Sequence, residues 1–286
     1  MSEILIDKER ARCAFGRSAD SYDDAAVLQR EVSKRMLERL DLVTLEPKTV
    51  LDLGCGTGEQ TQQLLQRYPK AGIHALDFAL PMLHRARKKG RWLRRPRCVC
   101  GDMEHLPLTN DSVDLICSNL AFQWASDPVL LYRECLRVLR PNGLLMFTTF
   151  GPDTLQELRA AWASVDDHAH VSPFMDMHDL GDILVNSGYA APVMDVERIV
   201  LTYGKVDDLM RDLKSIGAHN ATSGRQRGLT GKARMQAMRE AYECFRCDGV
   251  LPATYEVVYG HAWAPQKASR ASEVTVPLNM LNKGAD

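Results

Sequence analysis

Apolar positions early in the chain recur every four residues, and further along they cluster into short runs. The first pattern predicts an amphipathic helix over residues 24–40. Its apolar residues are Leu28, Val32, Met36 and Leu40. Residues 49–53 then form a short apolar run that stops at Gly54, as expected of a buried strand that leads into a turn.

Strand and helix patterns alternate as far as residue 150. Further strands are predicted over residues 73–76, 98–100, 113–117 and 144–150. Helices are predicted between them over residues 59–67, 81–89 and 127–139. Because this alternation is typical of βαβ units, the sequence predicts an α/β fold with a mostly parallel sheet and helices on both faces.

The alternation loosens after residue 150. Helices are predicted over residues 154–165, 177–186, 207–216 and 230–245, and strands over residues 193–201 and 255–259. We therefore divide the chain into an N-terminal helical segment, an α/β core, a helical insertion, a last core strand and a polar tail expected to be disordered. The five segments are residues 1–49, 50–201, 202–251, 252–264 and 265–286.

Composition and charge exclude several classes of protein. Hydrophobic residues make up 45% and charged residues 26% of the 286 residues, which is average for a globular protein. No apolar stretch approaches the roughly 20 residues that span a bilayer, and the first residues do not resemble a secretory signal. Eight scattered cysteines then suggest reduced thiols and a cytoplasmic location. With 36 Lys and Arg against 37 Asp and Glu, a polyanionic partner would need a local patch.

The sharpest chemical signal is the turn from Asp52 to Gly58, which reads Asp-Leu-Gly-Cys-Gly-Thr-Gly. Its glycines permit positive φ angles and close approach of a ligand. Two carboxylates end later strands in the same way: Asp77 could accept both ribose hydroxyls of an adenosine, and Asp102 its adenine amino group, with Met103 against the ring. The turn lacks the spacing of dinucleotide-binding and nucleotide-phosphate loops. Three strands thus end in ligand-type residues at one sheet edge.

This constellation resembles the class I S-adenosylmethionine-dependent methyltransferases over residues 50–150. The resemblance implies S-adenosylmethionine as cofactor, S-adenosylhomocysteine as its product, and a Rossmann-like fold. The residues it assigns to cofactor binding are Gln29, Asp52, Gly54, Gly56, Gly58, Asp77, Phe78, Met82, Asp102, Met103, Asn119 and Leu120.

Patches outside these motifs resemble a narrower family, the malonyl-carrier-protein O-methyltransferases of biotin synthesis. They include residues 14–17, 118–124, 147–151 and 213–218. The resemblance implies methylation of the free carboxylate of a malonyl thioester on an acyl-carrier protein or on CoA. Since a carboxylate is already ionised at pH 7, such an enzyme needs no general base.

Four residues are candidates for positioning that substrate: Tyr22, Gln123, Trp124 and Phe174. Residues 213–239 hold six Lys or Arg and no acid, which suggests a docking surface for an acidic carrier protein. The docking residues we choose are Arg211, Lys214, Arg225 and Arg227.

Two other patterns have a simpler interpretation. Only one residue separates Cys98 from Cys100, whereas both halves of a structural zinc site have two to four, and the second pair, Cys244 with Cys247, is distant in the chain. We therefore expect no metal and place these cysteines in the core. Residues 85–97 hold eight Lys or Arg, but no nucleic-acid-binding module accompanies them, which favours a solvated helix end. The sequence does not determine an oligomeric state.

Two alternative functions remain open. One is another small-carboxylate methyltransferase, such as one acting on aconitate. The other is a non-catalytic assembly factor that keeps the cofactor-binding fold.

Overall fold

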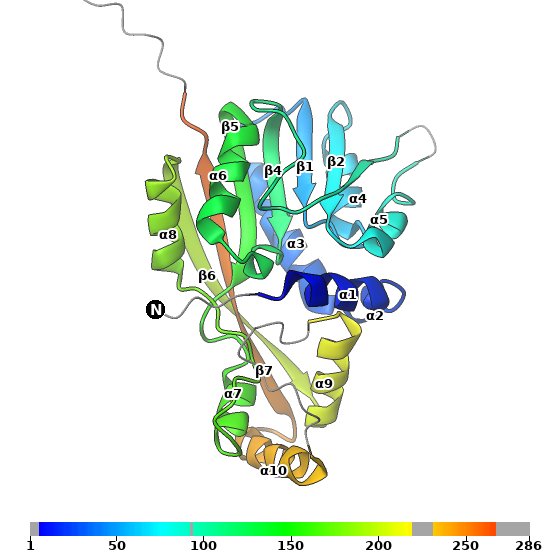
Figure 1. The fold of residues 1–286 in the computed structure, drawn as a ribbon, viewed down its shortest axis with the longest axis vertical. Coiled ribbons are helices and arrows are strands. Elements are labelled where there is room, and N and C mark those ends of the chain that lie inside the picture. The colour runs from blue at the N-terminus through cyan, green and yellow to red at the C-terminus, as the bar shows by residue number, and fades with distance from the viewer. Residues whose placement is uncertain (1–5, 92–93, 219–230, 267–286) are drawn as a thin grey trace, which may run out of the picture.

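A mostly parallel sheet forms the centre of the computed structural model, which describes residues 6–91, 94–218 and 231–266. Within these ranges the sheet has seven strands in the order β3-β2-β1-β4-β5-β7-β6 (Figure 1). The first five strands in this order, β3, β2, β1, β4 and β5, are parallel to one another. Strand β7 pairs antiparallel with both β5 and β6. The strands are β1 (Thr49–Leu53), β2 (Gly72–Asp77), β3 (Arg97–Cys100), β4 (Val113–Asn119), β5 (Leu139–Phe150), β6 (Ala190–Tyr203) and β7 (Leu251–Trp263).

Helices cover both faces of this sheet because successive strand residues point to opposite sides. Val50 packs in one core cluster with α3 (Val27–Arg39) and α4 (Glu59–Arg67), whereas Leu51 packs in a second cluster with α6 (Pro128–Val138) and α8 (Met177–Asn186). The remaining helices are α1 (Lys8–Ser18), α2 (Tyr22–Ala25), α5 (Leu80–Ala86), α7 (Gln156–Ala163), α9 (Val206–Ser215) and α10 (Lys232–Tyr242). Short 3₁₀ turns are η1 (Leu40–Leu42), η2 (Phe122–Trp124) and η3 (Glu243–Phe245).

The two antiparallel strands β6 and β7 continue past the parallel part of the sheet and form a smaller lobe with α7, α9 and α10 (Figure 1). Helices α7 and α10 pack on each other, and α9 contacts both β6 and α2. Helices α1 and α2 lie between this lobe and the carboxyl ends of the parallel strands (Figure 1). The lobe therefore faces the sheet edge where the sequence places its ligand-type residues.

The structure confirms the predicted α/β class and most of the predicted elements. The predicted helix over 24–40 is interrupted at Ala26, whose backbone leaves the helical region (φ −80°, ψ 44°), and α1 precedes it. Strands β6 and β7 are longer than predicted because their mutual pairing continues beyond the alternating residues, and β5 begins at Leu139, which pairs with Val113 of β4. The predicted boundary at residue 201 falls inside β6, and the division into five segments stays a prediction. Most of the predicted tail lies outside the described residues.

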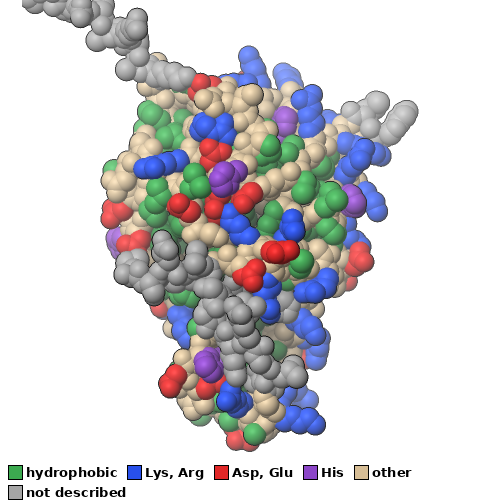
Figure 2. Space-filling model, in the orientation of Figure 1, with side chains coloured by type: hydrophobic (Ala, Val, Ile, Leu, Met, Phe, Trp, Pro, Cys, Tyr) green, Lys and Arg blue, Asp and Glu red, His purple; other side chains and the backbone are tan. Residues whose placement is uncertain are grey.

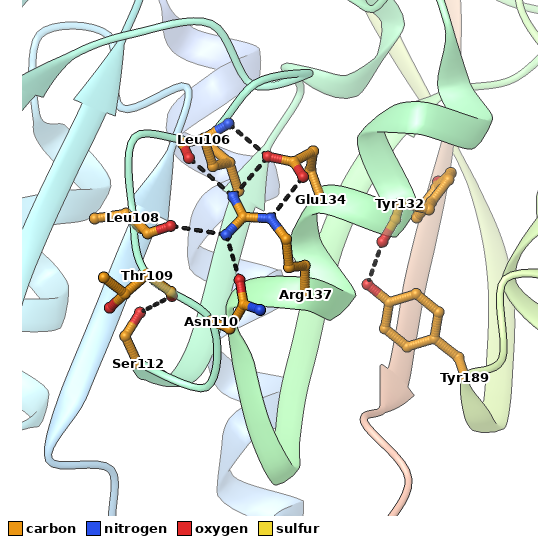
Figure 3. A network of polar contacts seen from close by, with 9 residues as sticks. All are labelled: Leu106, Leu108, Thr109, Asn110, Ser112, Tyr132, Glu134, Arg137 and Tyr189. Atoms are coloured by element: carbon orange, nitrogen blue, oxygen red, sulfur yellow. Dashed lines mark hydrogen bonds and ion pairs between the residues drawn. The ribbon is translucent and has the colours of Figure 1, made fainter.

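The loop after β3 is fixed by a polar network around Arg137 (Figure 3). The guanidinium of Arg137 donates to the carbonyl oxygens of Leu106 (2.9 Å) and Leu108 (2.8 Å) and pairs with Glu134. Glu134 in turn accepts from the Leu106 N–H (2.8 Å). These bonds tie the loop that contains Asp102 to α6.

Among the described helices, none is both long and apolar enough to cross a membrane.

Candidate functional site

Two neighbouring cavities lie at the carboxyl edge of the sheet. The first, of about 50 Å³, is lined by the glycine turn and by residues that follow β2, β3 and β4; we call it the turn cavity. The second, of about 440 Å³, lies between this edge and the smaller lobe, and we call it the lobe cavity. Four residues line both cavities: Phe15, Tyr22, Leu120 and Trp124. They mark the junction where a group held in one cavity could meet a group held in the other.

The glycine turn after β1 brings the backbone close to the turn cavity. Gly54 has φ +74°, and a Cβ atom there would lie 2.4 Å from the Cβ of Ala121. Gly58 has φ +86° and precedes α4, where a Cβ would meet the backbone of Ala86 at 2.7 Å. Gly54 and Gly56 line the cavity, whereas Gly58 packs on α5 and does not. Gly58 therefore sets the helix position and exposes no backbone to this cavity.

Asp77 supports the glycine turn from the end of β2. Its Oδ2 accepts from the Gly56 N–H (2.9 Å) and its Oδ1 from the Ala79 N–H (2.8 Å). The carboxyl is buried beside the cavity, and this burial raises its pKa to about 6, although the backbone N–H groups oppose the shift. Each carboxylate oxygen retains further acceptor capacity. The site thus holds an anionic acceptor next to exposed backbone.

Asp52 lies behind the turn and lines none of the cavities described here. Its carboxylate accepts from the Thr61 hydroxyl on α4, and burial raises its pKa to about 7. In this structure Asp52 supports the glycine turn and does not face either cavity.

Asp102 lines the turn cavity but already has a cationic partner. Lys8 Nζ lies 2.7 Å from Asp102 Oδ2 and 2.6 Å from Glu104 Oε2. Asp102 Oδ1 accepts from the Glu104 N–H (3.0 Å). Burial alone would raise the pKa of Asp102, but the hydrogen bonds from Lys8 and from the Glu104 N–H, together with the nearby positive charges, lower it. Asp102 is therefore held as an anion.

Helices α1 and α2 close the turn cavity from the lobe side. Phe15 packs edge-on against Trp124, with ring centroids 5.0 Å apart. The Thr57 hydroxyl donates to Asp23 (2.5 Å), which ties α2 to the glycine turn. Tyr22 is partly buried near Asp77, and desolvation together with that negative charge raises the pKa of its phenol. A neutral Tyr22 can donate a hydrogen bond at the junction.

Most predicted ligand residues converge on these cavities. Besides those above, the turn cavity is lined by Phe78, Met82, Met103 and Asn119. Gln29, Gln123 and Phe174 line the lobe cavity. Asn119 donates to the Gln29 carbonyl (2.9 Å), and Gln123 donates to the Leu120 carbonyl (2.7 Å). These amides are thus oriented by the backbone around the junction.

The predicted docking cations are only partly described. Arg225 and Arg227 lie outside the described residues. Arg211 is exposed and pairs with Asp208 (2.8 Å), and the exposed Lys214 lies on the rim of the lobe cavity. Arg239, which contributed to the basic count, pairs with Asp207 (2.8 Å). The net positive character of this segment is therefore smaller than its composition suggests.

The structure contradicts the interpretation of the cysteines in part and agrees with that of the basic run at residues 85–97. The core assignment is wrong for Cys100, Cys244 and Cys247, which are exposed because they lie in an edge strand and in surface turns. No cluster of metal-ligating side chains occurs among the residues that the structure describes. Lys and Arg gather beside α5 (Figure 2), where Arg85 pairs with Asp20 and Lys89 with Glu59 (3.4 Å). These pairs agree with a solvated helix end.

Several residues that line the cavities were missed from sequence, among them Lys8, Phe15 and Ala121. Lys8 and Phe15 come from α1, which carries no strong periodic signal, although Phe15 stands within the family-like patch at residues 14–17. Ala121 occupies the space into which a side chain at position 54 would point, and no local sequence pattern shows that these two residues are neighbours.

Comparisons with known proteins agree with this geometry. A family model described as "Methyltransferase domain" matches residues 51–147. The chain is 55% identical over 275 residues to a malonyl-[acyl-carrier protein] O-methyltransferase of Laribacter hongkongensis, with 93% of each chain covered. It is 50% identical to the protein of the same name from Halorhodospira halophila, covering 97% and 96% of the two chains. Among solved structures, the fold is similar to that of Haemonchus contortus phosphoethanolamine N-methyltransferase 2 in complex with S-adenosyl-L-methionine, with a TM-score of 0.54 and 14% sequence identity. The match covers 88% of this chain and 57% of that one, and it shows the fold alone.

Proposed function

The chain belongs to the family of malonyl-[acyl-carrier protein] O-methyltransferases, and from that membership we propose that it methylates the free carboxylate of a malonyl thioester carried by an acyl-carrier protein. The observation that carries this proposal is 50–55% identity to proteins of that name over more than nine tenths of the chain. The product would be a methyl ester, an early intermediate of biotin synthesis. The eight cysteines, none of which is paired with another, fit a reducing compartment such as the cytoplasm.

The turn cavity fits an adenosine-type cofactor in its chemistry. Exposed backbone at Gly54 and Gly56, an ionisable carboxylate at Asp77 and apolar side chains at Phe78 and Met103 suit a ribose and an adenine ring. When bound, S-adenosylmethionine supplies an electrophilic methyl group. The cavity has a volume of about 50 Å³, and it shares four lining residues with the larger lobe cavity beside it.

The junction between the cavities can position a carboxylate for transfer. Phe15 and Trp124 exclude water there, and Tyr22 can hold one carboxylate oxygen by donating its phenol proton. Orientation and desolvation of this kind supply the barrier reduction when the nucleophile is already ionised. We assign Tyr22, Gln123, Trp124 and Phe174 to substrate positioning on this basis.

Methyl transfer to purified malonyl-carrier protein, followed by mass spectrometry, tests the proposed function. We expect a mass gain of one methyl group and a single-turnover rate that is flat from about pH 6.5 to 8 at saturating cofactor, because a malonyl carboxylate needs no base. Methylation of a free tricarboxylate with none of the thioester would select the aconitate-type alternative. Failure with every acyl thioester would favour a non-catalytic assembly factor.

We also propose that the α9 side of the lobe receives the acidic carrier protein. Replacing Arg211 and Lys214 together by Glu should lower kcat/KM for malonyl-carrier protein by roughly tenfold and weaken its dependence on salt, because complementary charge steers association. Malonyl-CoA, which lacks the acidic protein surface and carries only the phosphate charges of CoA, should change much less. Lys70→Glu, an exposed reversal near the opposite edge of the sheet, is the matched control. Equal losses on both substrates would contradict a docking role, and the same comparison with Arg225 and Arg227 reversed tests the other two docking candidates.

A further inference from the structure

The lobe cavity is much larger than a malonyl group requires. Its volume of about 440 Å³ lies within the roughly 300–1,000 Å³ typical of pockets for drug-sized ligands. A malonyl group at the junction would leave the part lined by Trp162, His170 and Met235, which belong to the smaller lobe or to the loop after α7, without a ligand. The cavity therefore has room for more of a substrate than its acyl group.

His170 is the most constrained polar group of this distal part. Its ring stacks on Trp162 of α7, with centroids 3.7 Å apart and planes within 8°. Its Nε2 lies 2.8 Å from Asp166 Oδ1, and both side chains are largely buried, with 14% and 12% of their surface exposed. Arg234 of α10 lies 3.8 Å from the other oxygen of Asp166. The imidazole is thus fixed by an aromatic face and by a carboxylate whose other oxygen faces a cation.

This fixation determines which chemical group His170 can recognise. Burial would raise the pKa of Asp166, but the hydrogen bonds from the His170 ring and the His168 N–H, together with the charges of these two histidines, lower it. An ionised carboxylate can only accept, so we place the ring hydrogen on Nε2, 2.8 Å from Asp166 Oδ1. In a neutral imidazole the other nitrogen, Nδ1, is then a hydrogen-bond acceptor. Among the described residues no hydrogen bond to Nδ1 is formed. Because His170 lines the lobe cavity, its ring is a candidate acceptor for a donor group on the ligand.

The acyl end of the substrate has no such donor, because an ionised carboxylate and a thioester carbonyl are acceptors only. The pantetheine arm that bears the thioester does carry donors, in the N–H groups of its amides. We propose that the distal part of the lobe cavity binds the pantetheine arm and that His170, held by Asp166 and Trp162, accepts a hydrogen bond from one of its amides. This inference rests on the proposed function, since it assumes an acyl thioester as substrate.

His170→Phe tests the inference because phenylalanine can keep the stack on Trp162 and lacks the acceptor. We expect kcat/KM for malonyl-pantetheine to fall roughly fivefold to tenfold, the effect of one lost hydrogen bond. The rate with malonyl ethyl thioester, which has no arm, should stay unchanged. His168→Phe is the matched control, since His168 is exposed on the same loop and does not line the cavity. His170→Leu provides a second variant without an acceptor should His170→Phe fold poorly.

Calorimetric binding of pantetheine alone separates this inference from the proposed function. We expect the wild-type protein saturated with S-adenosylhomocysteine to bind pantetheine and His170→Phe to bind it roughly fivefold to tenfold more weakly. If pantetheine binds with this difference but no malonyl thioester is methylated, the proposed function is rejected, whereas the inferred pantetheine site in the lobe cavity is retained. Equal losses with both thioesters, or no loss with malonyl-pantetheine, would overturn the role of His170.

Discussion

We expect Asp77→Asn to lower the affinity for S-adenosylhomocysteine by at least ~100-fold. Hydrogen bonds to a charged group contribute roughly 1.5–3 kcal/mol each, and an ionised Asp77 could accept two from a ribose. Each loss of about 1.4 kcal/mol corresponds to a tenfold change in affinity. Asparagine keeps the side-chain volume and one acceptor oxygen for the N–H groups of Gly56 or Ala79, so the turn should persist. Isothermal calorimetry measures the affinity, and thermal melting verifies the fold.

The pH dependence of cofactor affinity is an independent test of the role of the Asp77 carboxylate. Burial raises the pKa of Asp77 to about 6, so the carboxylate is charged above pH 7 and protonated progressively as the pH falls through 6. Wild-type affinity should be flat from pH 7 to 8 and should decrease below pH 6, approaching tenfold per pH unit. Asp77→Asn should lack this decrease. Asp41→Asn, an exposed carboxylate paired with Arg67, is the control variant. Wild-type affinity retained by Asp77→Asn would show that the ribose binds elsewhere.

The second large effect is expected for Gly54→Ala. The new Cβ would lie 2.4 Å from the Ala121 Cβ, and the φ of +74° is unfavourable for an L side chain. Overpacking costs about 1–3 kcal/mol and the left-handed conformation about 1–2 kcal/mol. We expect a melting temperature lower by several degrees and cofactor affinity reduced by more than ~10-fold, because relief of the clash would move backbone that lines the turn cavity.

A double variant separates the two causes. Ala121→Gly removes the atom that clashes, and the next nearest atom, the Ala121 Cα, is 3.8 Å from the added Cβ. Gly54→Ala with Ala121→Gly should therefore recover part of the stability and affinity, while the φ penalty remains. Gly204→Ala, where a Cβ would meet nothing within 4 Å, should be nearly neutral. A double variant no better than Gly54→Ala would show that the clash with Ala121 is not what limits the turn.

Local patterns in the chain were enough to predict much of the first cavity. Periodicity identifies the strands, and a parallel sheet brings their carboxyl ends to one edge, so Gly54, Asp77 and Asp102 could be expected to lie together. The structure places all three in the lining of the turn cavity. Asp52 belongs to the same motif but points behind the turn, toward Thr61, because adjacent strand residues face opposite sides of the sheet.

The substrate side could not be predicted in the same way. Lys8 meets Asp102 across 94 positions of the chain, and the lobe cavity gathers residues from α2, α7, α9, β6 and β7. His170 appeared to be one of eight scattered histidines until Trp162 and Asp166 were found beside it. The Lys8 contact and the lobe cavity depend on packing between distant segments, whereas Trp162, Asp166 and His170 belong to one stretch of nine residues that the fold of the loop after α7 brings together.

The sequence by itself determined the fold class, the glycine turn and the carboxylates at the sheet edge, because backbone angles and side-chain periodicity are local properties of the chain. Only the tertiary structure decided that α1 closes the turn cavity through Lys8 and Phe15, and that the lobe built on β6 and β7 encloses a second cavity. Those features arise from packing between distant segments, where the burial of apolar side chains selects one arrangement among many that local propensity allows.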